Sequence, residues 1–420
     1  MSLCVQLSLQ GVPVLVIGGG RIAYRKCCQL EQEGAELVVI AKQFDACFQG
    51  AAYPCITDSY RPQQLQGKML VIACCDDLIT NRQICADAKQ AGIFAMSVQQ
   101  NCGASMHALA EEEAAEYVLA AGTKGASPLL ARQILKEMNA VVKETYASRI
   151  AMLRKLRPYI LQHIQKVERP QLLSRLVRLS QRDLYCIEQA LQGKGLQLVC
   201  FHGVKEDVSQ ELENFCAAIE HRKTNLVAAA AFLFEGVSDT SAQPVAQWLQ
   251  IVKSLHIPVT LVPMLFQNGR YYSRLLSIKS ENVRVKPLMF QERSEVWQCL
   301  QEVRRESGCA NLLVIYHSCV DGAFSELLQG LMKEDVHFHA VHEKQTMDCI
   351  LPWREESVAI LPMYMLRGSH YRKDSDGGSA LVQSLQKQNC SVHVLQASCI
   401  ELRAFQEFII QKGAVTSKRN

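Results

Sequence analysis

Short runs of apolar residues recur along this chain, and each is followed by a turn-forming loop and a stretch with helical spacing. The first apolar run covers 12–17, a helical stretch covers 24–33, and a second apolar run covers 35–41. Continuous apolar runs of this length are typical of strands that are buried on both faces of a parallel sheet. A further run at 68–73 continues the alternation. The pattern predicts an α/β domain with a parallel sheet over residues 1–125.

The spacing changes after this region. Residues 129–191 are rich in Leu, Arg, Gln and Glu at helical spacing, and only Pro158 and Pro170 interrupt them. We therefore expect a helical segment over 126–192. Gly193 and Gly195 then mark a linker to the rest of the chain.

Strand patterns resume after the linker, and they occur twice. Leu196–Gly203 and Leu312–Cys319 each place a histidine after an apolar strand. Val262–Arg274 matches Leu361–Lys373, with Pro, Met, Gly, Tyr and a basic residue in register. This repeat predicts two copies of one α/β subdomain, over 196–305 and 310–415.

The bulk composition excludes several classes of protein. The 420-residue chain is 49% hydrophobic and 20% charged, which fits several packed domains rather than disorder. Its formal net charge of +4 is too small for a nucleic-acid-binding face. There is no apolar run long enough to cross a bilayer, and the N-terminus lacks the basic region of a signal peptide. We expect a cytoplasmic protein that binds neither membrane nor nucleic acid.

Cysteine is frequent, but its spacing does not predict a metal site. The 18 cysteines include two adjacent pairs and no Cys-x-x-Cys motif. Zinc and iron–sulfur sites therefore have no support in the sequence. We expect reduced thiols that pack as small hydrophobic side chains in a cytoplasmic protein.

Three glycines directly follow the first strand. Gly18 permits a tight turn, Gly20 lets the backbone approach a pyrophosphate, and Ala23 keeps the helix close to the strand. The first amides of the helix, around Arg21 and Ile22, offer hydrogen bonds and a positive dipole to phosphates. This strand–loop–helix context predicts a Rossmann-like dinucleotide-binding domain.

The second strand leaves the choice between NAD and NADP open. Lys42 follows this strand, where a carboxylate would bind the ribose of NAD, and a lysine could instead meet the 2′-phosphate of NADP. The loop after the strand 68–73 carries Asp76, which we expect at the cofactor side of the same sheet.

Three motifs resemble those of precorrin-2 dehydrogenases, the first module of siroheme synthases, and they occur in that family's order: Gly18–Lys26, Ala73–Asp77 with Asn81, and Gly125–Arg132. The resemblance implies oxidation of precorrin-2 to sirohydrochlorin, with hydride transfer to NAD. It also implies a homodimer, and a tetrapyrrole site shaped by Ser127 and the helical segment. The arginines of that segment could meet substrate carboxylates, although such side chains are more often solvated: Arg154, Arg157, Arg169, Arg175 and Arg178.

One position departs from the family's pattern. Gln99 stands where the family carries an aspartate that is thought to take part in the chemistry. An amide forms hydrogen bonds but cannot accept a proton. Gln99 is therefore the catalytic-site candidate of this domain, and either another group takes the proton or the domain only binds its ligands. His107 lies close in sequence, although a lone histidine is more often structural.

The two copies of the C-terminal repeat differ in their histidines. The first copy has His202 with Tyr271, whereas the second has His317 with His370. Two imidazoles at strand-end loops can bind a metal or accept pyrrole protons, so we expect the second copy to be the active one. The alternative is that these are unrelated surface histidines.

This arrangement resembles the two-lobed class II sirohydrochlorin chelatases. The resemblance implies that His317 and His370 are the catalytic and metal-binding residues. It also implies a carboxylate near the metal, for which Glu343 is the candidate, with Glu235 at the corresponding place in the first copy. Arg367 is a candidate for binding the carboxylates of the substrate.

Together the two halves predict a bifunctional enzyme of siroheme biosynthesis, which oxidises precorrin-2 with NAD and then inserts Fe²⁺ into sirohydrochlorin. Two alternatives remain. Imidazole suits cobalt and nickel as well as iron, so the chain could be a cobalt or nickel chelatase of cobalamin-type biosynthesis. Because Gln99 replaces the aspartate, the chain could also be a chelatase whose N-terminal domain only binds NAD or the tetrapyrrole.

Overall fold

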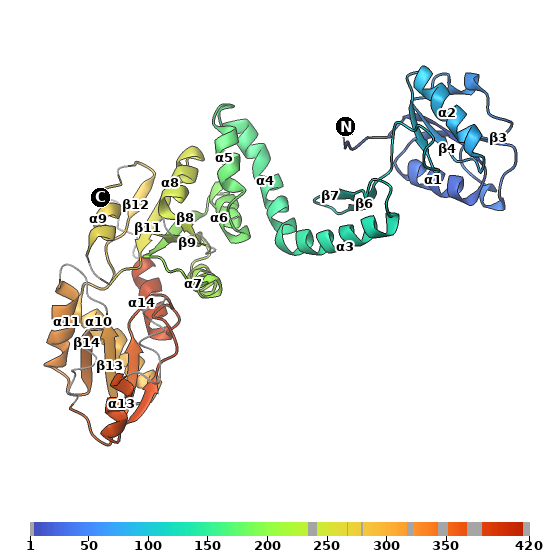
Figure 1. Ribbon diagram of the computed structural model, residues 1–420. Helices are drawn as coiled ribbons and strands as arrows, with labels where there is room; N and C mark the ends of the chain where they lie inside the picture. The colour runs from blue at the N-terminus through green and yellow to red at the C-terminus, as the bar shows by residue number, and fades with distance from the viewer. Residues whose placement is uncertain are drawn as a thin grey trace. The chain divides into compact units, whose positions relative to one another are not determined.

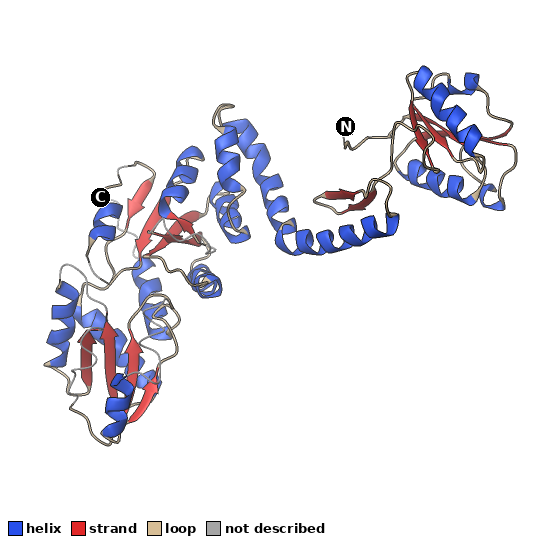
Figure 2. Ribbon diagram, in the orientation of Figure 1, coloured by secondary structure: helices blue, strands red, loops and turns tan. Residues whose placement is uncertain are grey.

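The computed structural model describes residues 4–233, 242–266, 268–278, 280–316, 322–342, 352–367 and 380–414. The chain forms two compact units, Met1–Glu144 and Thr145–Asn420 (Figure 1). Strands and helices alternate through most of both units (Figure 2). The predicted α/β fold class, with an N-terminal parallel sheet, helices in the middle of the chain and two further α/β subdomains, is confirmed.

The first unit is built on a five-stranded parallel sheet with the order β3-β2-β1-β4-β5. A two-stranded antiparallel hairpin and a long helix follow it. The elements are β1 Pro13–Ile17, α1 Arg21–Gln32, β2 Glu36–Ala41, η1 Ala46–Phe48, β3 Cys55–Thr57, η2 Pro62–Leu65, β4 Leu70–Ala73, α2 Leu78–Gln90, β5 Phe94–Ser97, β6 Ala110–Glu113, β7 Val118–Ala121 and α3 Pro128–Thr145.

The side chains of strand β1 point alternately to the two faces of the sheet, and helices cover both faces. Val14 and Val16 point into one cluster with residues of α1, whereas Leu15 and Ile17 point into another with residues of α2. All four side chains are buried. The period of two in the strand therefore feeds two separate cores, which is why the apolar run in the sequence is continuous rather than alternating.

The second unit begins with three helices and continues into two parallel sheets. Their orders are β10-β9-β8-β11-β12 and β14-β13-β15-β16, and we call the parts built on them the first and the second lobe. The elements are α4 Ala147–His163, α5 Arg169–Leu176, α6 Gln181–Leu191, β8 Gly195–Phe201, α7 Ser209–Arg222, β9 Leu226–Phe232, β10 Gln243–Pro244, α8 Val245–Ser254, β11 Val259–Pro263, α9 Arg270–Leu276, β12 Val283–Val285, α10 Arg293–Ser307, β13 Asn311–Tyr316, α11 Ala323–Met332, β14 Phe338–His342, β15 Ser357–Pro362, α13 Ala380–Lys387, β16 Ser391–Val394 and α14 Arg403–Ala414.

The helices expected as one segment over 126–192 are divided between the two units. Helix α3 belongs almost entirely to the first unit, whereas α4, α5 and α6 belong to the second. Buried side chains of these three helices, such as Leu156 and Leu184, share a cluster with Leu198 of β8. The three helices therefore cover one face of the first lobe.

The two lobes repeat one topology and one register. Strand β11 pairs with β8 so that Pro263 lies opposite Cys200, and β15 pairs with β13 so that Pro362 lies opposite Ile315. The amide that follows each proline donates to the strand opposite, Met264 to the Cys200 oxygen and the corresponding amide to Ile315, both at 2.8 Å. The repeat expected from the sequence is confirmed, and the register makes His202 the counterpart of His317.

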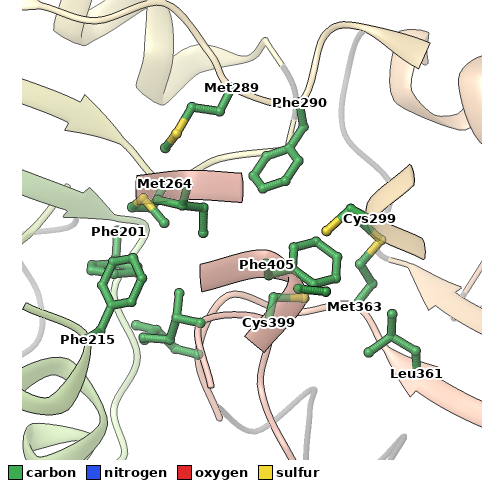
Figure 3. Packing of buried hydrophobic residues seen from close by; sticks show 14 of the residues in the cluster. Phe201, Phe215, Met264, Met289, Phe290, Cys299, Leu361, Met363, Cys399 and Phe405 are labelled. Carbon is green, nitrogen blue, oxygen red and sulfur yellow. The ribbon is translucent and has the colours of Figure 1, made fainter. Parts of the chain in front are cut away.

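The lobes share one hydrophobic core. Phe201 and Phe215 of the first lobe, Leu361 of the second and Phe405 of α14 belong to a single cluster (Figure 3). Phe266, which follows β11, stacks on Phe324 of α11 with the ring centroids 5.3 Å apart. Because apolar area is removed from water between the lobes, their relative position is fixed by packing.

The described cysteines pack mostly as small buried side chains, as the sequence predicts. Those of the described residues are all free, and most are buried. Burial raises the pKa of Cys27, Cys74 and Cys200 to about 12. These thiols therefore remain protonated at neutral pH and pack as small apolar groups. No helix in the described ranges is both long and apolar enough to cross a bilayer.

A buried carboxyl lies beneath the first lobe. Asp183, in the first turn of α6, is almost fully buried, and its Oδ2 has no hydrogen-bond partner among the described residues. The neighbouring Arg182 instead pairs with Glu220 at 2.9 Å. Burial raises the pKa of Asp183 to about 7, since the ionised form is poorly solvated there.

This carboxyl predicts a pH-dependent stability. Folded Asp183 holds its proton up to a pKa of about 7, whereas the unfolded carboxyl has its ordinary pKa of 3.8. The second unit should therefore lose stability as the pH rises between these values and stay at the lower level above them. Asp183→Asn should raise its free energy of unfolding at pH 8 by about 1–3 kcal/mol. Urea unfolding followed by tryptophan fluorescence measures this unit, because all 3 tryptophans lie in it.

Asp207 provides the matched control. Hydrogen bonds from Ser209 lower the pKa of Asp207, so Asp207→Asn should lose stability at pH 8 rather than gain it. The prediction would be contradicted if wild type and Asp183→Asn had the same free energy of unfolding at pH 5 and again at pH 8.

Candidate functional site

The carboxyl edge of the first sheet is the place where a ligand is expected. The strand order reverses at β1, because β2 lies on one side of β1 and β4 on the other. In sheets of this kind, ligands bind outside the carboxyl ends of the strands at this switch point. The loops that follow β1, β2, β4 and β5 meet there.

Two of the three glycines are required by close packing. A Cβ on Gly18 would lie 2.4 Å from the carbonyl oxygen of Cys74, and a Cβ on Gly19 would lie 2.1 Å from that of Gln43. Gly18 also has a φ of +132°, which side-chain-bearing residues rarely adopt. Gly18 and Gly19 therefore hold the loops after β1, β2 and β4 against one another.

Gly20 differs from its neighbours. A Cβ on Gly20 would meet nothing within 4 Å, so this side of the loop is open. Gly20 precedes α1, whose first turn carries neither a capping side chain nor an acidic residue. The amides of Arg21 and Ile22 at the start of this helix therefore suit an anion. Open space beside a helix N-terminus fits the pyrophosphate of a dinucleotide, as predicted for Gly20.

The loop after β2 brings a carboxylate that the sequence did not identify. The Asp45 amide donates to the Gly19 oxygen at 2.8 Å, and the Asp45 carboxylate lies 3.4 Å from Nε of Arg21. Arg21, expected near the cofactor, is thus paired with an acid at this edge. Lys42 follows β2 directly and is exposed, and its charge helps to lower the pKa of Asp77, after the hydrogen bonds that Asp77 accepts from Thr80 and Ile79.

The loops after β4 and β5 are joined by the side-chain amides of Asn81 and Gln99. Asn81 is fully buried, and it both accepts from the Cys75 amide at 3.0 Å and donates to the Cys75 oxygen at 2.7 Å. It also donates to Oε1 of Gln99 at 3.0 Å, and Gln99 donates to the backbone oxygen of Asp76 at 3.0 Å. Both ends of the Gln99 amide are used, because one accepts and the other donates. An aspartate here could not donate to the Asp76 oxygen, so Gln99 has a positioning role.

The Ser-Pro motif also reaches this edge. Ser127 caps α3 by accepting from the Leu130 amide at 3.2 Å, and its own amide donates to Thr123 at 3.0 Å. The preceding Gly125 accepts a hydrogen bond from Gln100, the residue after Gln99, at 3.2 Å. The predicted substrate-binding Ser127 therefore lies in a loop that is tied to the end of β5.

Exposed apolar side chains border the same loops. Ile22 belongs to the first turn of α1, Leu78 and Ile79 to the first turn of α2, and Val98 follows β5. Exposed apolar residues at several neighbouring loops are typical of a ligand-binding surface. His107 is exposed one residue beyond Met106, which bridges to Met96 of β5, so His107 is also at this end of the strand.

The main metal-site candidates of the second unit fall in parts of the chain that the structure does not describe. His317, His370 and Glu343 lie outside the described residues, as does Glu235. Their counterparts in the first lobe are described. His202 follows β8, Tyr271 lies in α9, and their rings are in edge-to-face contact with the centroids 4.6 Å apart. In the first lobe, these two positions of the repeat thus meet.

Arg367 and Arg169, two of the arginines expected to bind substrate, have partners within the protein. Arg367 forms a bidentate ion pair with Glu401. Arg169 donates to the backbone oxygens of Ile164 and Leu161, at 2.8 and 2.7 Å, and so closes the end of α4. A substrate carboxylate would have to displace these contacts. The other arginines of the helical segment remain predictions.

Comparisons with known proteins agree with the first unit. Residues 5–121 match the family model NAD_binding_7, described as "Putative NAD(P)-binding". Among curated proteins, the chain is similar to a siroheme synthase of Ectopseudomonas mendocina, with 37% identity over 141 residues that cover 33% of this chain and 30% of that protein. A siroheme synthase of Nitrosomonas eutropha is 28% identical over 172 residues, covering 39% and 36%.

A third relative matches over a longer stretch. The siroheme synthase of Photorhabdus laumondii is 27% identical over 211 residues, covering 49% of this chain and 42% of that protein. The chain thus spans only about a third to two fifths of the length of these relatives. A solved structure titled "SirC, precorrin-2 dehydrogenase" aligns with a TM-score of 0.35 and 23% identity, covering 45% of this chain and 99% of that chain. The predicted NAD(P)-binding domain and the resemblance of the chain to siroheme synthases are confirmed.

The glycine loop yields a test with two substitutions of equal size. Gly18→Ala should destabilise the first unit by about 3 kcal/mol or more, because the new Cβ strains the backbone and clashes with the Cys74 oxygen. Gly20→Ala should leave the stability almost unchanged but weaken NADH binding about tenfold or more, because its Cβ enters the open side of the loop. Calorimetric melting and NADH fluorescence titration measure the two effects. Wild-type affinity in Gly20→Ala would contradict this placement of the cofactor.

Proposed function

We propose that this chain is a bifunctional enzyme of siroheme biosynthesis. Its first unit oxidises precorrin-2 to sirohydrochlorin, and its second unit inserts Fe²⁺ into the product. The observation that carries the first half is the glycine loop, whose open side at Gly20 faces the start of a helix without acidic residues in its first turn. The similarity of the chain to siroheme synthases supports this class of reaction.

NAD, when bound, supplies the hydride acceptor. The residues of the first unit position it: Gly18 and Gly19 shape the loop, and the amides of Arg21 and Ile22 bind its phosphates. The exposed apolar residues at Ile22, Leu78, Ile79 and Val98 would contact the macrocycle and exclude water. This division of roles leaves only the proton to be transferred.

Oxidation of precorrin-2 releases a hydride and a proton, and the proton needs an acceptor. Gln99 cannot accept it, because its amide is neutral and already hydrogen-bonded at both ends. We assign this role to His107, whose exposed imidazole lies at the same end of β5 and can act as a general base. Gln99 would then hold the loop after β4 in place.

The second half of the proposal depends on the repeat. In the first lobe, the ring of His202, directly after β8, is in contact with the ring of Tyr271, near the start of α9. In the second lobe the sequence has His317 and His370 at these positions, and Glu343 directly follows β14. Two imidazoles and a carboxylate can accept the two pyrrole protons that Fe²⁺ displaces, and they can hold the ion before insertion. The iron is here a substrate.

A coupled absorbance assay on the full chain tests both steps. Precorrin-2 with NAD⁺ should give sirohydrochlorin and NADH, and added Fe²⁺ should then give siroheme. His107→Ala should slow the first step by about 100-fold and leave NADH binding unchanged. His317→Ala or His370→Ala should slow the second step by about 100-fold or more, whereas the matched change His202→Ala should have little effect.

The outcomes separate the alternatives. No oxidation together with normal metal insertion would reduce the first unit to a binding domain. Faster insertion of Co²⁺ or Ni²⁺ than of Fe²⁺ would contradict the assignment of iron. Equal losses in His202→Ala and His370→Ala would contradict the assignment of the active lobe.

We also propose that the chain is a homodimer, and that it works in the cytoplasm. Helix α3 presents four apolar side chains along one face that are between 37% and 57% exposed: Leu130, Ile134, Met138 and Val141. The spacing of four, four and three residues places them in one stripe. The neighbouring hairpin is tied to α3 by a 2.6 Å hydrogen bond from Tyr117 to Asn139. A second copy would remove this stripe from water.

The dimer predicts a change in mass. The double substitution of Ile134→Asp with Met138→Asp should convert the dimer to a monomer in sedimentation velocity, because two charges cannot be buried in an apolar interface. Lys136→Asp, on the exposed polar side of the same helix, serves as the control and should leave the dimer intact. A wild-type monomer, or a dimer that tolerates both aspartates, would contradict this interface.

A further inference from the structure

We propose that Asp45 makes the nucleotide site selective for NAD over NADP, by accepting hydrogen bonds from the hydroxyls of the adenosine ribose. This inference rests on the proposed function, whose cofactor it narrows. The sequence had left the choice open, because no acidic residue directly follows β2. In the structure, Asp45, which comes three residues after Lys42, lies beside the glycine loop.

The backbone fixes where Asp45 lies. Its amide donates to the Gly19 oxygen at 2.8 Å. A Cβ on Gly19 would lie 2.1 Å from the Gln43 oxygen, so the loop between β2 and η1 lies directly on the glycine loop. An acidic side chain at this position, beside the glycines and after the second strand, is where dinucleotide-binding domains hold the ribose.

Aromatic packing fixes the loop from the other side. The ring of Phe44 lies 5.2 Å from that of Phe48 in η1, and Tyr24 of α1 lies 5.2 Å from Phe48 as well. All three rings contact the buried core on the α1 side of the sheet. Asp45 is therefore held between an anchored aromatic residue and a backbone hydrogen bond, so its position is set before any ligand arrives.

The carboxylate of Asp45 has one fixed and one available oxygen. Oδ1 accepts from the Cys47 amide at 3.1 Å and caps η1, whereas Oδ2 lies 3.4 Å from Nε of Arg21. The Cys47 amide and then Arg21 lower the pKa of Asp45, so it is ionised at neutral pH. The Arg21 side chain is 88% exposed, and an exposed ion pair of this kind contributes little to stability, so a ribose hydroxyl can take its place.

This geometry favours a ribose and opposes a phosphate. The 2′- and 3′-hydroxyls of NAD donate hydrogen bonds, and an ionised carboxylate accepts them strongly. The 2′-phosphate of NADP has no proton to donate at neutral pH and would place its charge against that of Asp45. Asp45 cannot turn away, because Oδ1 holds the cap of η1.

Fluorescence titrations of the full chain with NADH and with NADPH test this inference. Wild type should bind NADH about tenfold or more tightly than NADPH. Asp45→Asn removes the charge but keeps a residue that caps well, so the fold should persist. In this variant the preference should fall about tenfold, with NADPH binding more tightly than before, because Arg21 is released to meet the 2′-phosphate.

Asp58→Asn is the matched control. Asp58 follows β3, the next strand in the sheet, and it is also paired with an arginine, Arg61, at 3.1 Å. Its substitution should leave the ratio of the two affinities unchanged. A wild-type preference for NADPH, or an unchanged ratio in Asp45→Asn, would overturn the inference while leaving the proposed function intact. Failure of wild type to bind either dinucleotide would overturn both.

Discussion

The close approach of three backbone segments at the end of β1 is the constraint on which the first unit depends. The loops after β1, β2 and β4 touch through Gly18 and Gly19, and the nearest atom to a Cβ at each glycine would be a carbonyl oxygen, that of Cys74 or of Gln43. No side chain fits between them, so the loops are held at a fixed spacing. The position of Asp45 follows from the contact with Gly19. Gly20, which packs against nothing, is left as the open face.

The second unit reaches comparable order by repetition and packing. Its lobes pair equivalent strands in the same register. Phe201 of β8 and Val314 of β13 belong to the same hydrophobic core. A shared core means that neither lobe can shift without exposing apolar area, such as the ring of Phe405. The two lobes can therefore differ in single side chains, such as Tyr271 in the first and His370 at the equivalent position of the second, while packing maintains the scaffold.

Much of the fold could be predicted because its strands are buried on both faces. The continuous apolar runs at β1, β4, β8 and β13 predicted such strands directly. The sequence repeat predicted that the two lobes have the same fold. The division of the helices after Ser127 could not be predicted, because helical spacing does not reveal which sheet a helix covers. The position of Asp45 could not be predicted either. The loop that carries Asp45 folds back onto Gly19, and such a contact leaves no periodic pattern in the sequence. The role of Gln99 was likewise hidden, because its partners lie 18 and 23 positions away in sequence.

The buried thiols have a consequence for the handling of metals. A thiolate binds soft and borderline transition metals tightly, but a protonated thiol does not. With pKa values raised to about 12, Cys27, Cys74 and Cys200 hold almost no negative charge at neutral pH. The sulfur atoms of these three buried cysteines are therefore poor ligands for a metal ion, so this part of the protein's sulfur does not compete with imidazole and carboxylate groups for a cation.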